Sequence, residues 1–207
     1  MSEANVVTGK EYPPQVVEQS PFAIPSKKLA IWLFIIADGM TFAAILVAYG
    51  FLRNASPNWP RPFHSIVNVA IMTFILISSS FTMLMAVQAA RLGNRARAVS
   101  WMLITVAGGI VFAILHIREW LGLINDGVGL SKNPWGDSLF GSTFFGITGL
   151  HLTHVVGGVI ALIAVTFLYK SGRYSADHIE TVGLYWHFVD LVWMFVVPMV
   201  YLLNFTR

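Results

Sequence analysis

Five long apolar runs account for most of this chain of 207 residues. Each run reaches the roughly 20 residues that a helix needs to cross about 30 Å of hydrocarbon. Only helices and closed barrels satisfy the backbone in lipid, and runs of this length favour helices. Charged residues make up 11% of the chain, whereas soluble domains carry about 25%. The sequence therefore predicts an all-α integral membrane bundle of five transmembrane helices, with spans at about 29–52, 65–90, 98–121, 139–169 and 180–203.

The segments outside these runs set the domain boundary and the orientation. Residues 1–28 are polar and contain four prolines, so we expect a cytoplasmic tail followed by one membrane domain over 29–207. The positive-inside rule places the side with more Lys and Arg in the cytoplasm. This predicts a cytoplasmic N-terminus and a C-terminus outside. The cations on the first side are Lys10, Lys27, Lys28, Arg91, Arg95, Arg97, Lys170 and Arg173, and those on the other are Arg53, Arg61, Arg118, Lys132 and Arg207.

The composition excludes several kinds of site. Because the chain has no cysteine, it has no thiolate zinc site, no iron–sulfur cluster and no Cys-x-x-Cys-His haem attachment. The net charge is only +3, and the cations lie at the ends of spans, where membrane topology requires them. We therefore expect membrane lipids as partners and no nucleic acid.

Ionisable side chains within the spans are the candidates for function. Such a group costs several kcal/mol in hydrocarbon (roughly 2.5–3.5 on insertion scales) unless it is paired, neutralised or able to reach the interface. The candidates are Asp38, His116, Glu119, His151, His154, His187 and Asp190.

Asp38 lies near the middle of the first run, in "IIADGMTF". No Lys or Arg occurs in that run between Lys28 and Arg53, so no cation within it can neutralise the carboxylate. We expect the carboxyl to be largely protonated at neutral pH and to donate a hydrogen bond across helices or to water. It is either a proton-handling group or a structural contact between helices.

His116 and Glu119 are three residues apart, on one face of the third run near its outer end. Arg118 lies beside them. Two interpretations stay open. The three side chains form an interfacial cluster of ion pairs and hydrogen bonds, or they bind a lipid headgroup.

Two further pairs have the same spacing on the fourth and fifth runs. His151 and His154 indicate either hydrogen bonds between helices or a metal site. Their spacing is shorter than in four-helix haem cytochromes, and no Glu-x-x-His motif is present to support a di-iron site. His187 and Asp190 are expected to bond each other, a neighbouring helix or another subunit.

Several motifs together resemble subunit III of the haem–copper oxidases, the cytochrome c oxidase family. They are "WLFIIADGMTFAAILVAYGF" (32–51), "HIREW" (116–120), "GSTFFGITGLHLTHVVGG" (141–158) and "YWHFVDLVWMF" (185–195). Their order and spacing match the family over about residues 29 to 203.

The resemblance implies an accessory subunit of a respiratory terminal oxidase that reduces oxygen to water and pumps protons. Such a subunit has no catalytic residue, no metal and no redox centre of its own, and packs against subunit I, which holds haems and copper, in a complex with subunit II. It keeps the catalytic subunit stable, supports proton entry and binds phospholipid. Asp38 matches the family's buried carboxyl position, and the other six candidates match family motif positions.

The chain departs from the mitochondrial type, which has seven helices, since five are expected here. Such short forms are similar to bacterial bo-type quinol oxidases and some bacterial cytochrome c oxidases, which implies a multi-pass protein of the bacterial inner membrane. A partner would then supply the two missing helices, and the electron donor is either cytochrome c or quinol. Two alternatives are a subunit of a nitric oxide reductase complex and a stand-alone membrane haem cytochrome.

Overall fold

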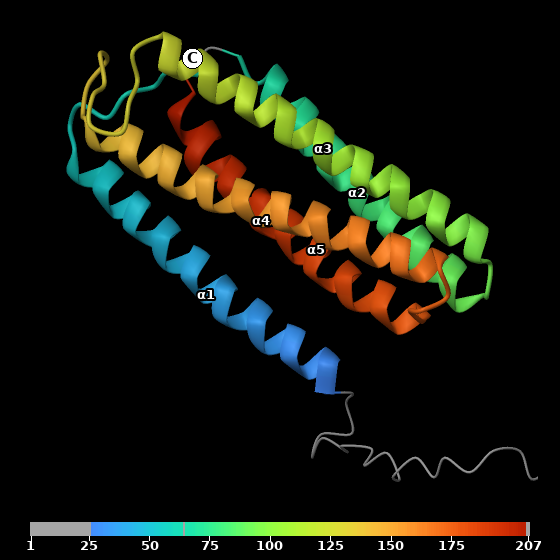
Figure 1. The fold of residues 1–207 in the computed structure, drawn as a ribbon. Coiled ribbons are helices and arrows are strands. Elements are labelled where there is room, and N and C mark those ends of the chain that lie inside the picture. Colours follow the sequence, from blue (N-terminus) through green and yellow to red (C-terminus); the bar gives the residue numbers. More distant parts are fainter. Residues whose placement is uncertain (1–25, 64, 206–207) are drawn as a thin grey trace, which may run out of the picture.

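The computed structural model describes residues 26–63 and 65–205 and is all-helical in this part of the chain. Figure 1 shows five long helices joined by short connections. Their bounds are α1 Ser26–Ala55, α2 Val67–Arg91, α3 Arg95–Asn125, α4 Leu139–Lys170 and α5 Ala176–Val196, after which the chain continues as a π turn, Val197–Tyr201, and a 3-10 turn, Leu202–Asn204.

The predicted fold class is confirmed, because all five helices are long and apolar enough to cross a membrane. Three of the predicted spans fall within α1, α3 and α4, whereas the second begins two residues before α2 and the fifth continues past α5 through the π and 3-10 turns. α1 begins at Ser26, so its first three residues belong to the segment expected to be a tail. The rest of that expected tail, residues 1–25, lies outside the described residues.

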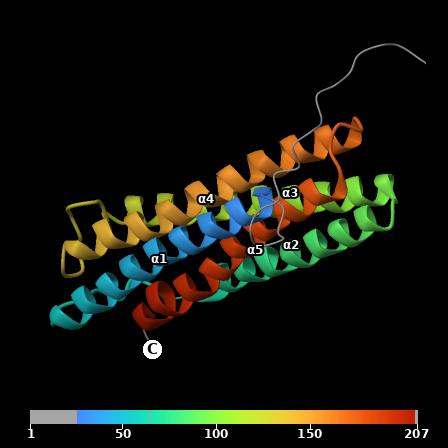
Figure 2. The same ribbon diagram turned by 90° about the horizontal axis from the view of Figure 1, so that it is seen from below.

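Helices α2 to α5 form a ring of four, and α1 lies outside it. Each of the four packs on two neighbours, in the cyclic order α2, α3, α4 and α5. α1 packs chiefly on α5 and α4, and Figure 2 shows it lying along these two helices. The bundle therefore has its own core, to which α1 adds one further layer.

Large aromatic side chains and small residues together build the core of the ring. Trp186 of α5 is fully buried and faces Gly109 of α3 and Gly158 of α4. A Cβ atom at Gly109 would lie 2.6 Å from Trp186 Cη2, which is too close for two carbon atoms. Trp186 Nε1 also donates to Ser79 Oγ of α2 at 3.0 Å, so one side chain joins all four helices.

The turn between α2 and α3 is set by two residues. Gly93 has φ 74°, a left-handed conformation that favours glycine and ends helices. Asn94 then begins the next helix, because its Oδ1 accepts from Arg97 N at 3.1 Å. The short connection brings the C-terminal turns of α2 beside the N-terminal turns of α3.

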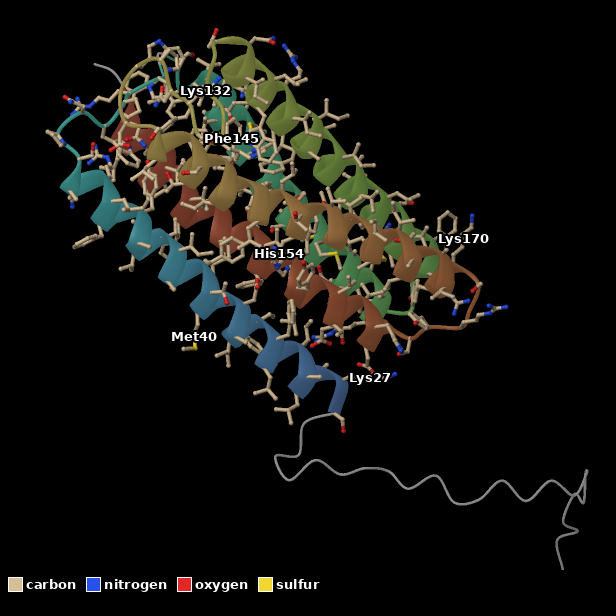
Figure 3. All side chains as sticks on the ribbon, turned by 60° about the vertical axis from the view of Figure 1, so that its left-hand side comes forward. Lys27, Met40, Lys132, Phe145, His154 and Lys170 are labelled. Atoms are coloured by element: carbon tan, nitrogen blue, oxygen red, sulfur yellow. The ribbon has the colours of Figure 1, made fainter. Side chains whose placement is uncertain are left out.

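The two ends of the bundle differ in composition. One end carries the start of α1 and the α2–α3 and α4–α5 turns, and we call it the basic end. The other end carries the α1–α2 and α3–α4 loops and the last described residues, and we call it the loop end. Figure 3 shows Lys27 and Lys170 at the basic end, Lys132 at the loop end and His154 between them. The described cations of the basic end are Lys27, Lys28, Arg91, Arg95, Arg97, Lys170 and Arg173.

Candidate functional site: ionisable residues in the bundle

Asp38 and His154 meet between α1 and α4. Asp38 Oδ2 lies 3.1 Å from His154 Nε2, and each side chain is 15% exposed. The two atoms are within ion-pair distance, but Asp38 Oδ2 is not aligned for a hydrogen bond. The sequence placed no cation near Asp38 within its own run, and the structure supplies a basic group from another helix. Hence this carboxyl has a partner that α1 alone did not reveal.

The other ring nitrogen of His154 restricts where protons can reside. His154 Nδ1 lies 2.8 Å from the backbone oxygen of Leu150. A carbonyl oxygen only accepts, so Nδ1 carries a proton. In the neutral ring Nε2 would then present a lone pair to Asp38 Oδ2. The contact is favourable only when one further proton is present, either on the carboxyl or on the ring. This geometry makes the two side chains the candidate for proton handling in the bundle.

His151, three residues before His154, lies in the core of the ring and also meets Phe42 of α1 edge-on at 6.5 Å. Its side chain is fully buried. The ring stacks on Trp193 with centroids 5.0 Å apart and meets Phe112 edge-on at 5.8 Å. Residues at this spacing point about 60° apart around a helix, because each residue turns it by 100°. The two histidines thus share Phe42 of α1 as a neighbour, but only His154 meets Asp38 and only His151 stacks on Trp193.

His116 of α3 occupies the same aromatic core. It is fully buried, stacks on Phe112 at 5.6 Å and meets Trp193 edge-on at 5.5 Å. Within residues 26–63 and 65–205, neither ring nitrogen of His116 or His151 has a hydrogen-bond partner. Buried polar atoms without partners destabilise a fold by about 1–3 kcal/mol each. The two imidazoles therefore lie in one aromatic core with four ring nitrogens that no described residue binds.

Glu119 lies one turn beyond His116 and is bound by two side chains that the sequence analysis did not identify. Tyr201 donates to Glu119 Oε2 at 2.7 Å, and Asn68 of α2 donates to Oε1 at 3.4 Å. Pro198 cannot donate a backbone hydrogen bond, and the chain from Val197 widens there into the π turn that carries the buried Tyr201. An Asn in the first turn of the second span and a Tyr three residues after Pro198 were the available signals. Arg118 is exposed and does not join this cluster.

His187 and Asp190 are half-buried on α5. The Ser80 hydroxyl of α2 lies near the Asp190 carboxyl, but neither Ser80 Oγ nor Asp190 Oδ1 forms a hydrogen bond with any described residue. The pair therefore lies at the α2–α5 boundary, partly exposed on the outside of the bundle, with hydrogen-bonding capacity unused.

The candidate residues do not gather into a metal centre. No group of three or more His, Asp or Glu side chains that could hold a metal ion occurs in the described part of the chain. Four candidates instead extend across the bundle from α1 to α3 in the order Asp38, His154, His151 and His116. This arrangement places one carboxyl and three imidazoles in sequence between α1 and α3.

Comparison with known proteins connects this arrangement to a family. The family model described as Cytochrome c oxidase subunit III matches residues 19–205. The chain is 34% identical to "Cytochrome c oxidase subunit 3" of Synechocystis sp., over 86% of this chain and 76% of that protein. It is also 34% identical to "Quinol oxidase subunit 3" of Bacillus spizizenii, over 85% and 86% of the two chains. Identity with "Cytochrome bo(3) ubiquinol oxidase subunit 3" of Pseudomonas aeruginosa is 30%, over 84% and 83%.

The family-model match covers all five helices and every candidate residue, and the relatives are named after both cytochrome c and quinol oxidases. The resemblance inferred from the motifs is thereby confirmed. The chain belongs to the cytochrome c oxidase subunit III family, the accessory subunits of haem–copper oxidases.

Proposed function

We propose that this chain is the accessory subunit III of a bacterial terminal oxidase that reduces oxygen to water and pumps protons. It lies in the inner membrane with its basic end in the cytoplasm, and it contacts subunit I directly in a complex with subunit II. Haems and copper reside in these partners. The observation that carries the proposal is the family match over residues 19–205.

The surface of α5 supports assembly with another subunit. His187 and Asp190 are half-buried at mid-span, so part of each side chain stays exposed on the outside of the bundle, although Asp190 Oδ1 itself is covered within the chain. A carboxyl left against lipid tails would cost several kcal/mol (roughly 2.5–3.5 on insertion scales). A helix of subunit I that donates a hydrogen bond to Asp190 removes this cost, so the α2–α5 boundary is the proposed contact.

Purification of the tagged chain in mild detergent tests the assembly. Mass spectrometry should identify subunits I and II in the purified complex, and the haem spectrum should remain with subunit I when the chain is separated. Asp190→Leu should reduce recovery of subunit I, whereas Met194→Leu, an exposed neighbour on the same helix, should not. Haem that stays with the separated chain would contradict the proposal and favour a stand-alone cytochrome.

The Asp38–His154 site is proposed to support proton entry to the catalytic subunit. It holds one proton between two helices, and α1 leaves it near the surface of the bundle, with each side chain 15% exposed. Asp38→Asn keeps a neutral polar group of the same shape but cannot release a proton. Assembly should therefore survive this change, while proton uptake by the oxidase slows.

Proton uptake by the complex in sealed vesicles tests this role. Thr41→Val provides the control, because Thr41 lies one turn along α1 and its hydroxyl only bonds its own helix. If Asp38→Asn leaves uptake at the rate of the control over pH 6 to 9, the site is structural.

Phospholipid binding is the remaining part of the proposal. At the loop end, His116 is fully buried and Glu119 is bound by Tyr201 and Asn68. Arg118 is the exposed member of the predicted set, so it would be the contact for a headgroup there. Arg118→Gln should lower the amount of lipid that native mass spectrometry finds on the complex after detergent washing.

A further inference from the structure

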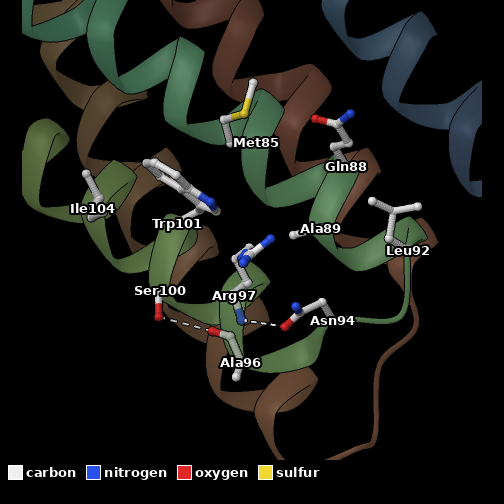
Figure 4. A pocket seen from close by; sticks show the side chains of 10 residues that line it. All are labelled: Met85, Gln88, Ala89, Leu92, Asn94, Ala96, Arg97, Ser100, Trp101 and Ile104. Carbon is white, nitrogen blue, oxygen red and sulfur yellow. Dashed lines mark hydrogen bonds between the residues drawn. The ribbon is translucent and has the colours of Figure 1, made fainter.

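A cavity of about 1050 Å³ opens beside the α2–α3 turn at the basic end. Figure 4 shows it between the last turns of α2 and the first turns of α3. Small-molecule sites enclose about 300–1,000 Å³, so the cavity has room for a sizeable polar group and part of a chain. Among its lining residues are Met85 and Gln88 of α2 and Arg97, Ser100, Trp101 and Ile104 of α3.

Polarity in this cavity changes with depth along the helices. Arg97 lies in the first turn of α3 and is exposed. Trp101 follows one turn later, about 6 Å deeper at 1.5 Å per residue, and Ile104 lies deeper again. On α2, Gln88 is close to the helix end and Met85 lies one turn further in. The lining therefore changes from a cation to an indole and then to apolar side chains. A membrane interface changes in the same way from charged headgroups to hydrocarbon, and tryptophan is enriched at headgroup level.

The charge of the cavity is uncompensated. Arg91 pairs with Glu180 at 2.8 Å, and Arg95 lies over the Tyr169 ring at 5.4 Å. The guanidinium of Arg97, in contrast, has no ion pair with any described residue, and no Asp or Glu lines the cavity. Its helix also has no acidic residue in the first turn. The Arg97 guanidinium therefore offers several N–H donors without an ion-pair partner to the cavity, which suits the binding of a phosphate group.

We propose that this cavity binds an anionic phospholipid, with Arg97 pairing with the phosphate. Gln88, exposed across the cavity from Arg97, can donate its amide N–H groups to the remaining phosphate oxygens. Trp101 lies against the glycerol region, and one acyl chain follows Met85 and Ile104 into the membrane. This site is at the opposite end of the bundle from Arg118. It rests on the membrane placement of the proposed function and does not depend on association with an oxidase.

Lipid retention by the full chain, in the assembly with which it is purified, tests the proposal. Washed protein is offered phosphatidylglycerol, phosphatidylcholine or inorganic phosphate, and bound species are counted by native mass spectrometry. Arg97→Gln should lower the affinity for phosphatidylglycerol about tenfold, the loss expected for one charged hydrogen-bonded contact. Arg97→Lys should restore part of it. Lys170→Gln is the matched control, because it removes a cation from the same end without touching the cavity.

A second readout locates the lipid. Phosphatidylglycerol brominated near the top of its acyl chains should quench part of the tryptophan fluorescence, and Trp101→Phe should remove that part. Equal retention of phosphatidylglycerol by wild type and Arg97→Gln would overturn the proposal, as would equal affinity for phosphatidylcholine. Displacement of the lipid by millimolar inorganic phosphate would show a site for free anions instead. Crosslinks from Trp101 to another subunit would show that protein fills the cavity.

If the chain proves not to accompany oxidase subunits, the lipid result still stands by itself. Conversely, loss of lipid retention in Arg97→Gln with normal recovery of subunits I and II would support both proposals independently.

Discussion

Helix α1 and the four-helix ring are held in different ways. Half of the α5 span is buried within the protein, and a third or more of each of α2, α3 and α4, but only 11% of the α1 span is buried. The four helices of the ring are held mainly by complementary packing of their side chains, because Trp186 fills the space left by Gly109 and Gly158. α1 has few such contacts and presents most of its apolar surface outward.

Polar contacts hold α1 at three levels along its length. At the basic end Lys28 Nζ donates to Glu180 at 3.0 Å. Near the middle Asp38 meets His154 at 3.1 Å. At the loop end Arg53 donates to the Asn204 side chain at 3.1 Å and to the Leu203 carbonyl at 2.7 Å. Each contact joins α1 to a segment more than 100 residues away in sequence.

The difference follows from the solvent that surrounds the helices. Lipid tails are as apolar as leucine, so an exposed apolar helix face carries no penalty in a membrane. α1 can therefore remain largely uncovered, and hydrogen bonds and charge pairs decide where it lies. The ring should respond most to changes of volume, and α1 should respond most to changes of charge or hydrogen bonding.

Gly109→Val should have the largest effect and should act on the ring. The new methyl groups would overlap Trp186 and Val159, whose nearest atoms each lie 2.6 Å from a Cβ at this position. Overpacking costs typically about 1–3 kcal/mol, and here Trp186 also holds Ser79. We expect a lower unfolding temperature in detergent, followed by near-ultraviolet circular dichroism.

Gly122→Val is the matched control for this prediction. It places the same side chain on the same helix, where nothing lies within 4 Å of the added Cβ. Its unfolding temperature should stay close to that of the wild type. Equal losses in the two variants would mean that the glycines matter for helix geometry and not for the space they leave to Trp186.

Asp38→Leu should release α1 while leaving the ring intact. The change leaves His154 Nε2 without its partner, and polar contacts between helices in membranes are worth about 1–2 kcal/mol. The chain has no cysteine, so introduced cysteines can carry spin labels at chosen positions. Labels at Val47 of α1 and Ile160 of α4, both exposed, should show a broader distance distribution in Asp38→Leu and a wild-type distribution in Asp38→Asn.

A second pair of labels tests whether the ring is affected. Ile114 of α3 and Ile160 of α4 are both exposed and lie on helices of the ring. Their distance distribution should be unchanged in Asp38→Leu. If it broadens as much as the first pair, α1 and the ring are one cooperative unit and the comparison fails.

The sequence predicted the helices well and their contacts poorly. The predicted start of the fourth span at residue 139 coincides with the start of α4, because the length of an apolar run is set locally by the thickness of the bilayer. The pairing of Asp38 with His154 depends instead on where α1 lies relative to α4, and no local pattern encodes that position. The spacing of His151 and His154 indicated a shared face, and both rings do meet Phe42 of α1, but the spacing did not indicate that only His154 reaches Asp38 while His151 stacks on Trp193.

Tyr201→Phe should have a smaller effect, and on the ring instead of α1. It removes the hydroxyl that donates to Glu119 Oε2 at 2.7 Å but keeps the aromatic ring in the core. We expect a loss of about 1 kcal/mol in the free energy of unfolding, with an unchanged distance between the labels at Val47 and Ile160. A double-mutant cycle with Glu119→Gln measures the coupling of the two groups.

Tyr169→Phe is the control for the hydroxyl deletion. Tyr169 is also buried, but no hydrogen bond of its hydroxyl occurs among the described residues. This variant should unfold like the wild type. A coupling energy near zero between Tyr201 and Glu119 would show that the contact contributes little, and that volume alone stabilises the ring.

Lys28→Ala should have the smallest effect and should act only at the basic end of α1. Lys28 shares Glu180 with Arg91, which remains at 2.8 Å from the other carboxylate oxygen, so the carboxylate keeps one partner. Partly exposed ion pairs contribute about 0–1 kcal/mol. Labels at Leu33 of α1 and Phe167 of α4, both exposed, should show a modestly broader distance distribution. Wild-type protein should approach the same distribution in 1 M salt, where the Debye length falls to about 3 Å. The distance between the labels at Val47 and Ile160 should not change, because the Asp38–His154 contact remains.

Lys132→Ala, at the loop end, is the control and should change the distance distribution of neither pair of labels. If Lys28→Ala frees the whole of α1 as Asp38→Leu does, the three polar contacts act as one, and the helix is held at its end and not at its centre.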